Sequence, residues 1–227
     1  MADTPAVLFD VDGTLVDSNY LHVYAWTRAF HEAGIAVESW RIHRSIGMDG
    51  DRLIQSLSGD ADDDAQKRAK ELHTRYLKEA APLLRPLSGA RELLQRVSSL
   101  GLQVVLASSA SEDELSLSRK VLDCDELISA ATSSKDVEEA KPDPTIIEIA
   151  MERAGVDADH AVYVGDAVWD IIACGRAGVP AIGLLSGGVS REELEKAGAR
   201  AVFDNPHDLS EHIDSSPIAA LRAQSVG

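Results

Sequence analysis

Short apolar segments that alternate with longer amphipathic segments are the feature of this 227-residue chain that most constrains its fold. Each apolar run has the length of a strand, and the segments between the later runs have helical spacing. Such alternation predicts an α/β fold in which crossover helices join parallel strands. The predicted strands are 6–9, 102–107, 126–131, 161–164, 180–184 and 200–203, and the predicted helices between them are 111–122, 143–154, 166–177 and 190–197.

The stretch from about residue 19 to residue 86 interrupts this alternation. It contains no convincing strand, and its spacing predicts helices over 19–33, 38–46, 50–57 and 65–80. We therefore predict a helical insertion after the first strand, with Pro82 and Pro86 at its return to the sheet. This divides the chain into an α/β core, residues 1–17 plus 87–227, and a helical cap, residues 18–86. Residues after about 214 have little pattern, and we expect them to fray.

Charge and composition exclude several classes of partner. The chain has 22 Lys and Arg against 38 Asp and Glu, a net charge of −16. Nucleic acids and anionic membranes need a basic surface, so we expect neither as a main partner. No apolar stretch approaches the ~20 residues of a membrane span. The first apolar run ends at Asp10, which argues against a signal peptide, and the spacing of the two cysteines matches no zinc or redox site. The expected location is the cytoplasm.

The segment Asp10-Val11-Asp12-Gly13-Thr14 directly follows the first predicted strand. Active sites of open parallel sheets lie beyond the carboxyl ends of the strands, so both carboxylates are expected there. Two carboxylates this close repel each other unless a cation or a proton intervenes. The segment therefore predicts a chemical site, although a charged Asp-Gly turn is the simpler alternative.

Other polar residues follow later strands at equivalent positions. Ser108 comes after the second run, Asp166 and Asp170 after the fourth, and Lys141 lies in a proline-flanked loop. Each has a structural alternative, since Ser108 or Asp166 is a suitable helix cap and Lys141 is a suitable solvated lysine. Their convergence on one sheet edge is harder to attribute to chance than any one of them.

Together these residue types suit phosphoryl transfer. Asp10 is a candidate nucleophile that would form an aspartyl-phosphate. Mg²⁺ prefers oxygen ligands, and it would screen the acids from an anionic substrate. Ser108, its neighbour Ser109 and Lys141 are candidate ligands of the phosphoryl oxygens. Asp12 is placed to protonate the leaving oxygen and then activate water.

At this point the sequence resembles a known family, the haloacid dehalogenase superfamily. Four motifs carry the resemblance, in order between residues 7 and 188: Asp10-Val11-Asp12-Gly13-Thr14, Ser108, Lys141-Pro142 and Gly165-Asp166 followed by Asp170. The resemblance implies a Rossmann-like core with a helical cap. It also implies Mg²⁺ held by Asp10, by the backbone carbonyl of Asp12 and by Asp166. Asp170 would support the metal indirectly, through a water molecule or through contact with one of its ligands.

The branch of the superfamily affects the expected reaction. True dehalogenases lack the second aspartate of the first motif, so Asp12 favours a phosphatase or a mutase. The branch with the greatest resemblance contains phosphoglycolate phosphatase-like enzymes and beta-phosphoglucomutase. The mutase's cap arginine is not matched after Gly47, which favours hydrolysis of a small phosphorylated metabolite. Candidate specificity residues in the predicted cap are His22, Trp26, Arg44, Met48 and Arg52.

Three alternatives stay open at this stage. A sugar-phosphate mutase would use the same core and keep the phosphoryl group from water. A signalling receiver would accept phosphate on an aspartate without turnover, but receivers are about half this length and need no helical insert. A catalytically silent scaffold conflicts with the complete set of acids. The sequence names neither the phosphate ester nor the oligomeric state, which we leave as monomer or homodimer.

Overall fold

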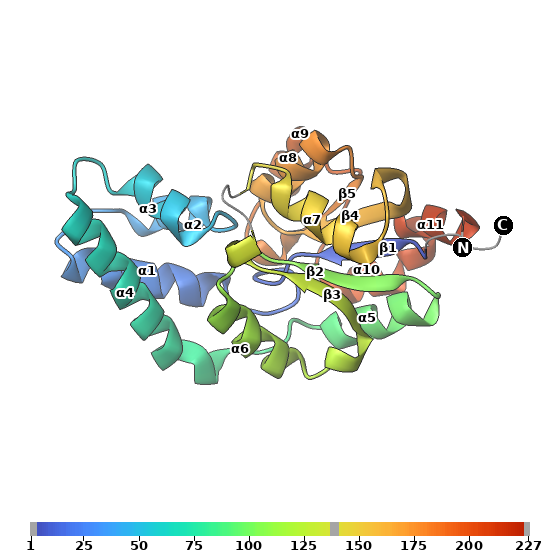
Figure 1. The fold of residues 1–227 in the computed structure, drawn as a ribbon, viewed down its shortest axis with the longest axis horizontal. Helices are drawn as coiled ribbons and strands as arrows, with labels where there is room; N and C mark the ends of the chain where they lie inside the picture. The colour runs from blue at the N-terminus through green and yellow to red at the C-terminus, as the bar shows by residue number, and fades with distance from the viewer. Residues whose placement is uncertain (1–3, 137–140, 225–227) are drawn as a thin grey trace.

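The computed structural model describes residues 4–136 and 141–224, and within them it contains a six-stranded, wholly parallel sheet (Figure 1). The strand order is β3-β2-β1-β4-β5-β6, so β1 occupies an inner position. This confirms the predicted α/β class. The strands are β1 (Ala6–Phe9), β2 (Gln103–Ala107), β3 (Ile128–Thr132), β4 (Ala161–Gly165), β5 (Ala181–Leu184) and β6 (Ala201–Phe203).

Alternate residues of each strand pack into two separate apolar layers, because successive side chains of a strand point to opposite faces. Val7 and Phe9 belong to one cluster, and Leu8 belongs to the other. Both faces of the sheet are thus covered, as parallel sheets require. The Phe9 side is covered by α5 (Ala90–Ser99), α6 (Glu112–Leu122), α10 (Pro206–Glu211) and α11 (Ile218–Gln224), and the Leu8 side by α7 (Thr145–Ala154), α8 (Val168–Ala177) and α9 (Arg191–Ala197).

Three of these helices, α5, α10 and α11, were not predicted from the sequence. The structure also contradicts the prediction for the end of the chain. We expected residues after about 214 to fray, yet α11 packs on the core, with Ile218 and Leu221 buried. Two apolar residues three apart are too weak a pattern to identify a helix, although they suffice to anchor one turn on an existing core. The third strand also begins later than predicted, because residues 125–127 form a 3₁₀ turn.

Four helices follow β1 and lie beside the sheet, at the left of Figure 1: α1 (Asn19–Glu32), α2 (Ser39–Ser45), α3 (Gly50–Leu57) and α4 (Asp63–Ala80). We call residues 18–86 the helical segment. It has its own apolar cluster, which includes Trp26, Phe30, Leu53 and Tyr76. No strand of the sheet contributes a residue to this cluster among those described, so the helical segment packs largely on itself.

The two chain connections between the sheet and the helical segment run side by side. The Asp17 N–H donates to the Arg85 carbonyl at 2.9 Å, and the Leu87 N–H donates to the Leu15 carbonyl at 2.9 Å. Val16 also forms an antiparallel bridge with Pro86. Backbone hydrogen bonds therefore join the point where the chain leaves the core to the point where it returns.

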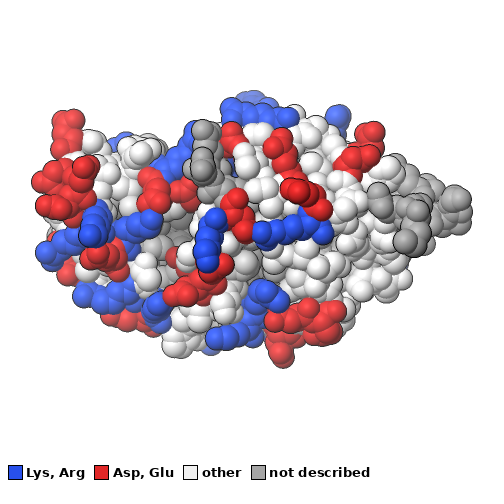
Figure 2. Space-filling view, viewed as in Figure 1, with Lys and Arg blue, Asp and Glu red and all other residues white. Residues whose placement is uncertain are grey.

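Acidic and basic side chains are interspersed over the face drawn in Figure 2, with no single basic patch on that face. Among the helices described, none combines the length and apolar character needed to cross a bilayer.

Candidate active site

The candidate active site begins at the carboxyl end of β1. Neighbouring strands β2 and β4 flank β1, and the strand order reverses its direction there, which is where open α/β sheets form ligand crevices. Asp10 immediately follows β1, and its N–H donates to the Val164 carbonyl on β4 at 2.9 Å. The backbone of Asp10 thus continues the sheet for one residue, which fixes its carboxylate at this edge.

Lys141 is fully buried beside Asp10. Its ammonium donates to Asp10 Oδ1 at 2.8 Å and to Tyr163 Oη at 2.7 Å, and it lies 2.7 Å from Asp170 Oδ1. Burial alone would lower the pKa of Lys141, but the charges of Asp10 and Asp170 outweigh it and raise that pKa. The ammonium is therefore charged, and it binds two carboxylates from separate elements, Asp10 directly after β1 and Asp170 on α8.

Asp166 follows β4 and lies across from Asp10. Its two oxygens accept hydrogen bonds from Thr14 Oγ1 at 3.0 Å and from Asn19 Nδ2 at 2.7 Å. Two glycines leave room for it: a Cβ atom on Gly187 would lie 1.8 Å from Asp166 Oδ2, and one on Gly13 would lie 2.4 Å away. Asp166 is thus held in a close-fitting cradle between two loops.

The acidic cluster fits a hard divalent cation. One carboxylate oxygen each from Asp10, Asp166 and Asp170 lies within 4.8 Å of the others. Three carboxylates against the Lys141 ammonium leave two excess negative charges. Burial, together with the Asp10 and Asp170 charges, raises the pKa of Asp166 well above its usual range, and burial is also the main cause that raises the pKa of Asp10 to about 7. An all-oxygen set with this excess charge suits Mg²⁺.

Asp170 is the member of the cluster with the most internal partners. Besides Lys141, its carboxylate accepts hydrogen bonds from Tyr163 Oη at 3.2 Å and from the Ala167 N–H at 3.1 Å. Its side chain is fully buried. These contacts make Asp170 a support for Lys141 as well as a neighbour of the other two acids.

Asp12 has different surroundings from Asp10. Its carboxylate accepts a 2.5 Å hydrogen bond from Ser18 Oγ and lies 3.5 Å from His22 Nε2. Burial raises the pKa of Asp12, but hydrogen bonds from His22 and Ser18 and the charges of His22 and Lys141 outweigh it and hold that pKa below the usual range. The two aspartates of one motif are therefore pushed in opposite directions, the arrangement expected of residues with separate roles in proton transfer.

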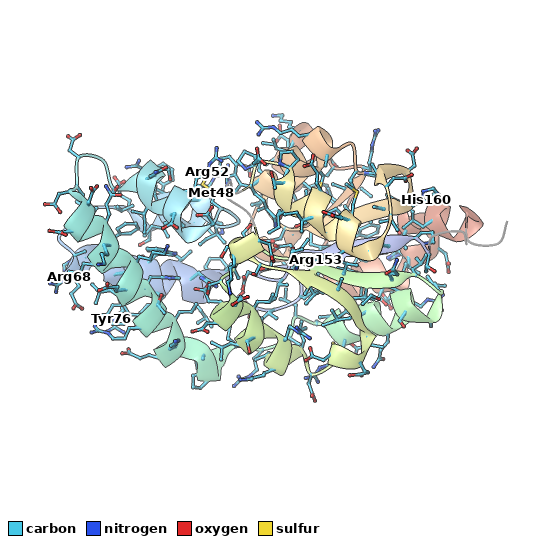
Figure 3. All side chains as sticks on the ribbon, viewed as in Figure 1. Met48, Arg52, Arg68, Tyr76, Arg153 and His160 are labelled. Carbon is cyan, nitrogen blue, oxygen red and sulfur yellow. The ribbon has the colours of Figure 1, made fainter. Side chains whose placement is uncertain are left out.

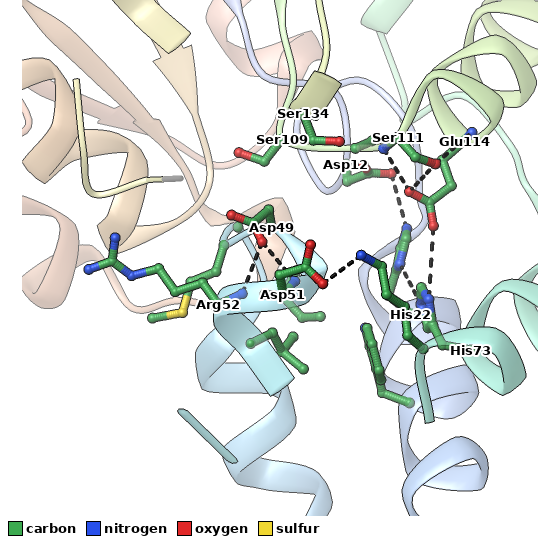
Figure 4. Close-up of a pocket in the computed structure, with 18 of the residues that line it drawn as sticks. Asp12, His22, Asp49, Asp51, Arg52, His73, Ser109, Ser111, Glu114 and Ser134 are labelled. Atoms are coloured by element: carbon green, nitrogen blue, oxygen red, sulfur yellow. Dashed lines mark hydrogen bonds and ion pairs between the residues drawn. The ribbon is translucent and has the colours of Figure 1, made fainter. Parts of the chain in front are cut away.

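A cavity of about 640 Å³ opens onto Asp10 and Asp12 between the sheet edge and the helical segment (Figure 4). Ser109 also lines it, and its buried hydroxyl has no hydrogen-bond partner among the described residues. Ser108 is buried behind the lining, where its hydroxyl accepts from the Ala110 N–H at 3.1 Å. Ser108 uses its hydroxyl oxygen as an acceptor and its proton has no acceptor among the described residues, so both predicted phosphate-binding serines keep a proton to donate, with Ser109 on the cavity lining and Ser108 behind it.

Four of the five residues predicted to set specificity line this cavity: His22, Trp26, Met48 and Arg52. Figure 3 shows Met48 and Arg52 on the side of the helical segment that faces the sheet, while Arg68 and Tyr76 lie on its far side. Arg44 does not line the cavity, and its guanidinium instead pairs with Glu193 on α9. The structure therefore places Arg44 at a contact between α2 and the core.

Sequence reasoning missed several polar residues of the site. Asn19 binds Asp166, Tyr163 binds Asp170, and His73 and Glu114 line the cavity. A hydroxyl in the otherwise apolar strand at Tyr163 was a usable signal. His73 and Glu114 offer none, because both lie on amphipathic helices whose polar faces resemble any solvated surface.

The sequence model of the family described as haloacid dehalogenase-like hydrolase matches residues 7–184. The chain belongs to this family. The match includes the motifs at Asp10, Ser108, Lys141 and Asp166, and it confirms the resemblance seen in the sequence.

Three relatives, one a curated protein and two solved structures, each match most of this chain. A phosphoglycolate phosphatase of Rhodospirillum rubrum is 29% identical over 212 residues, which cover 88% of this chain and 87% of the relative. The crystal structure of a hydrolase from Pseudomonas syringae is 37% identical, with a TM-score of 0.89 over 93% of this chain and 98% of that one. A beta-phosphoglucomutase of Clostridium difficile has the same fold at 21% identity, with a TM-score of 0.81 over 99% of this chain and 100% of that one.

Proposed function

We propose that this hydrolase is a Mg²⁺-dependent phosphatase that releases phosphate from a small phosphate monoester through an aspartyl-phosphate on Asp10. The observation that carries the proposal is the placement of Asp10 and Asp12 on one cavity, with Lys141 and two further acids packed directly behind Asp10. The resemblance to the phosphoglycolate phosphatase of Rhodospirillum rubrum supports hydrolysis of a phosphate ester.

The residues proposed to hold Mg²⁺ are Asp10 and Asp166 through their carboxylates and Asp12 through its backbone carbonyl. Bound there, the ion would neutralise charge on the phosphoryl group and keep Asp10 ionised. Lys141 adds a second positive charge, 2.8 Å from Asp10 Oδ1. These charges lower the repulsion between an attacking carboxylate and an anionic phosphorus centre.

Asp10 is the proposed nucleophile. Its oxygen forms a bond to phosphorus while the bond from phosphorus to the ester oxygen breaks, which leaves a phosphoryl group on the carboxylate. Ser109, whose hydroxyl has no partner among the described residues, is available to donate to a phosphoryl oxygen. Attack of water on phosphorus then releases phosphate and restores Asp10.

Asp12 is the proposed acid and base. It donates a proton to the leaving oxygen in the first step and takes a proton from water in the second. Ser18 and His22 contact its carboxylate and hold it in place beside the cavity. The same contacts favour its ionised form, the form that takes a proton from water in the second step, and the proton taken there is the one that Asp12 donates to the leaving oxygen in the next turnover.

We further propose that the helical segment is a cap domain, residues 18–86, and that residues 1–17 with 87–227 form the catalytic core. The proposal is supported by its separate apolar cluster and by the cavity that lies between it and the sheet edge. In this arrangement His22, Trp26, Met48 and Arg52 contact the part of the substrate beyond its phosphate. Closure of such a cap would exclude bulk water from the phosphoenzyme.

A phosphate-release screen over small phosphorylated metabolites, with and without Mg²⁺, tests the proposal. We expect Mg²⁺-dependent multiple turnover that Asp10→Asn abolishes and that EDTA abolishes reversibly. The matched control Asp159→Asn removes an exposed acid outside the site and should retain full activity. An active Asp10→Asn protein would refute the mechanism, and conversion of a sugar 1-phosphate to a 6-phosphate without phosphate release would identify a mutase instead. A single turnover with stable phosphorylation would identify a receiver.

A further inference from the structure

A second group of possible metal ligands lies on the wall of the cavity, apart from the acidic cluster. It consists of His22 on α1, His73 on α4 and Glu114 on α6, all of which line the cavity (Figure 4). One ligand atom from each of the three side chains lies within 4.8 Å of the other two. Two imidazoles and a carboxylate are a donor set that zinc sites of enzymes use.

The spacing of the two imidazoles suits a shared ion. His22 Nδ1 and His73 Nε2 are 3.3 Å apart. Two nitrogens bound to one tetrahedral Zn²⁺ at about 2.05 Å would be roughly 3.3–3.4 Å apart. The rings therefore need little movement to bind one ion together. A direct hydrogen bond between the rings accounts for the same distance, and the experiment below separates the two.

Neighbours also limit the orientations of these side chains. Glu114 Oε2 accepts from the N–H and the hydroxyl of Ser111 at 2.9 and 2.8 Å, as part of the cap of α6. Glu114 Oε1 lies 3.9 Å from His73 Nδ1, the ring nitrogen other than the one that faces His22, so binding of an ion at Nε2 requires the Glu114 carboxylate to turn toward it. The His73 ring stacks on Trp26, with ring centres 3.9 Å apart and an angle of 11° between their planes. The fold thus already restricts these side chains, so they lose less conformational entropy when an ion binds.

The second nitrogen of His22 has the partner that metal-bound histidines usually have. His22 Nε2 lies 3.5 Å from Asp12 Oδ1. A carboxylate beside the outer ring nitrogen fixes the ring and increases the basicity of the nitrogen that binds metal. His22 therefore links the group to the proposed catalytic acid.

We propose that His22, His73 and Glu114 form a second metal site, which takes a transition-metal ion such as Zn²⁺ and leaves the all-oxygen cluster to Mg²⁺. Imidazole nitrogen favours Zn²⁺, whereas carboxylate and carbonyl oxygen favour Mg²⁺, so the two sites differ in selectivity. A bound ion joins α1 and α4 of the helical segment to α6, which packs on the sheet. Occupancy thus stabilises one arrangement of the segment against the core.

Cobalt is the probe, because tetrahedral Co²⁺ absorbs visible light far more strongly than the octahedral ion. Full-length protein is stripped with chelator and returned to saturating Mg²⁺, which occupies the acidic cluster, before titration with Co²⁺. We expect one equivalent of the strongly absorbing form, quenching of Trp26 fluorescence and full displacement by one equivalent of Zn²⁺. The thermal midpoint should rise with the concentration of Zn²⁺.

Two variants remove ligands while they keep local structure. Glu114→Gln retains the helix cap, because glutamine also serves at that position of a capping box, and His73→Phe retains the stack on Trp26. Each should weaken Co²⁺ binding at least ten-fold. The control His207→Gln removes an exposed histidine that pairs with Glu211 on α10, and it should bind Co²⁺ as the unchanged protein does.

Absence of the tetrahedral absorption would overturn the proposal and would leave the two rings as a hydrogen-bonded pair. Unchanged binding in both variants would overturn it as well, as would loss of the signal on raising Mg²⁺, which would place Co²⁺ in the acidic cluster. None of these measurements uses activity. If the proposed phosphatase function also holds, Zn²⁺ should inhibit phosphate release, and His73→Phe should relieve that inhibition. If Co²⁺ binds as expected but Zn²⁺ does not inhibit, the proposed phosphatase function is contradicted and the metal site is not.

Discussion

Replacement of Lys141 by methionine gives the sharpest test of the charge balance behind the cavity. Methionine has a similar length but no charge, so the change leaves Asp10 and Asp170 buried without their shared cation. Breaking a buried ion pair by removal of one partner costs about 3–5 kcal/mol. For a chain of this size about 1 kcal/mol shifts the thermal midpoint by roughly 2–4 °C, so we expect a fall of about 6–20 °C.

Tyr163→Phe is the matched comparison. It removes one hydroxyl from the same cluster, but Lys141 keeps Asp10, Asp170 and the Ala107 carbonyl as acceptors for its three protons. The expected cost is about 1–1.5 kcal/mol, the usual net value of one hydrogen bond. Activity should persist in Tyr163→Phe and fall at least 100-fold in Lys141→Met, since the latter loses a charge beside the reacting group.

Urea denaturation of the two variants in the absence of divalent ions measures both free energies of unfolding, provided that the slopes agree. Mg²⁺ should recover part of the loss in Lys141→Met, because it supplies a positive charge to the same carboxylates. The reasoning is refuted if Lys141→Met is within about 1 kcal/mol of the unchanged protein, or if Tyr163→Phe is destabilised as strongly.

Three further predictions follow from single contacts. Gly187→Ala places a methyl group 1.8 Å from Asp166 Oδ2 and should weaken Mg²⁺ binding at least ten-fold by calorimetry, whereas Gly175→Ala, with nothing within 4 Å, should leave it unchanged. Asp12→Asn should lower turnover by about 10²–10⁴ with no loss of the folded state by circular dichroism, and activity close to normal would remove Asp12 from the mechanism. Glu193→Gln removes the exposed partner of Arg44 and should change the free energy of unfolding by less than about 1 kcal/mol in urea titrations; a larger loss would mean that this contact is more than a surface ion pair.

The central fold could be predicted because its strands are continuous apolar runs. Phe9 and Val164 belong to such runs, and both faces of the parallel sheet bury them. Three helices could not be predicted, those at residues 90–99, 206–211 and 218–224. Each has only a few apolar residues, and these form a recognisable pattern only once the core on which they pack is known. The expected fraying after about residue 214 was wrong for the described residues up to 224 for this reason, and residues 225–227 lie outside the described part of the chain.

The candidate site divides in the same way. Asp10 and Asp166 follow strand ends, so sequence position alone indicates the sheet edge at which they meet. Asn19, His73 and Glu114 reach the site through the packing of helices, and no local pattern fixes how one helix is rotated against another. Arg44 illustrates the limit, since a sequence reading cannot distinguish a side chain that enters a cavity from one that pairs across to α9.

The paired backbone hydrogen bonds at residues 15–17 and 85–87 have a consequence for how such a molecule can change. Because the connections that leave and re-enter the core are hydrogen-bonded to each other, the helical segment is an insertion at a single place in the core. Replacement of the residues between 17 and 85 by a different inserted segment would leave the register of the parallel strands unchanged. Under the proposed function, exchange of this one segment would change the residues that face the substrate while Asp10, Asp12 and Lys141 stay in place.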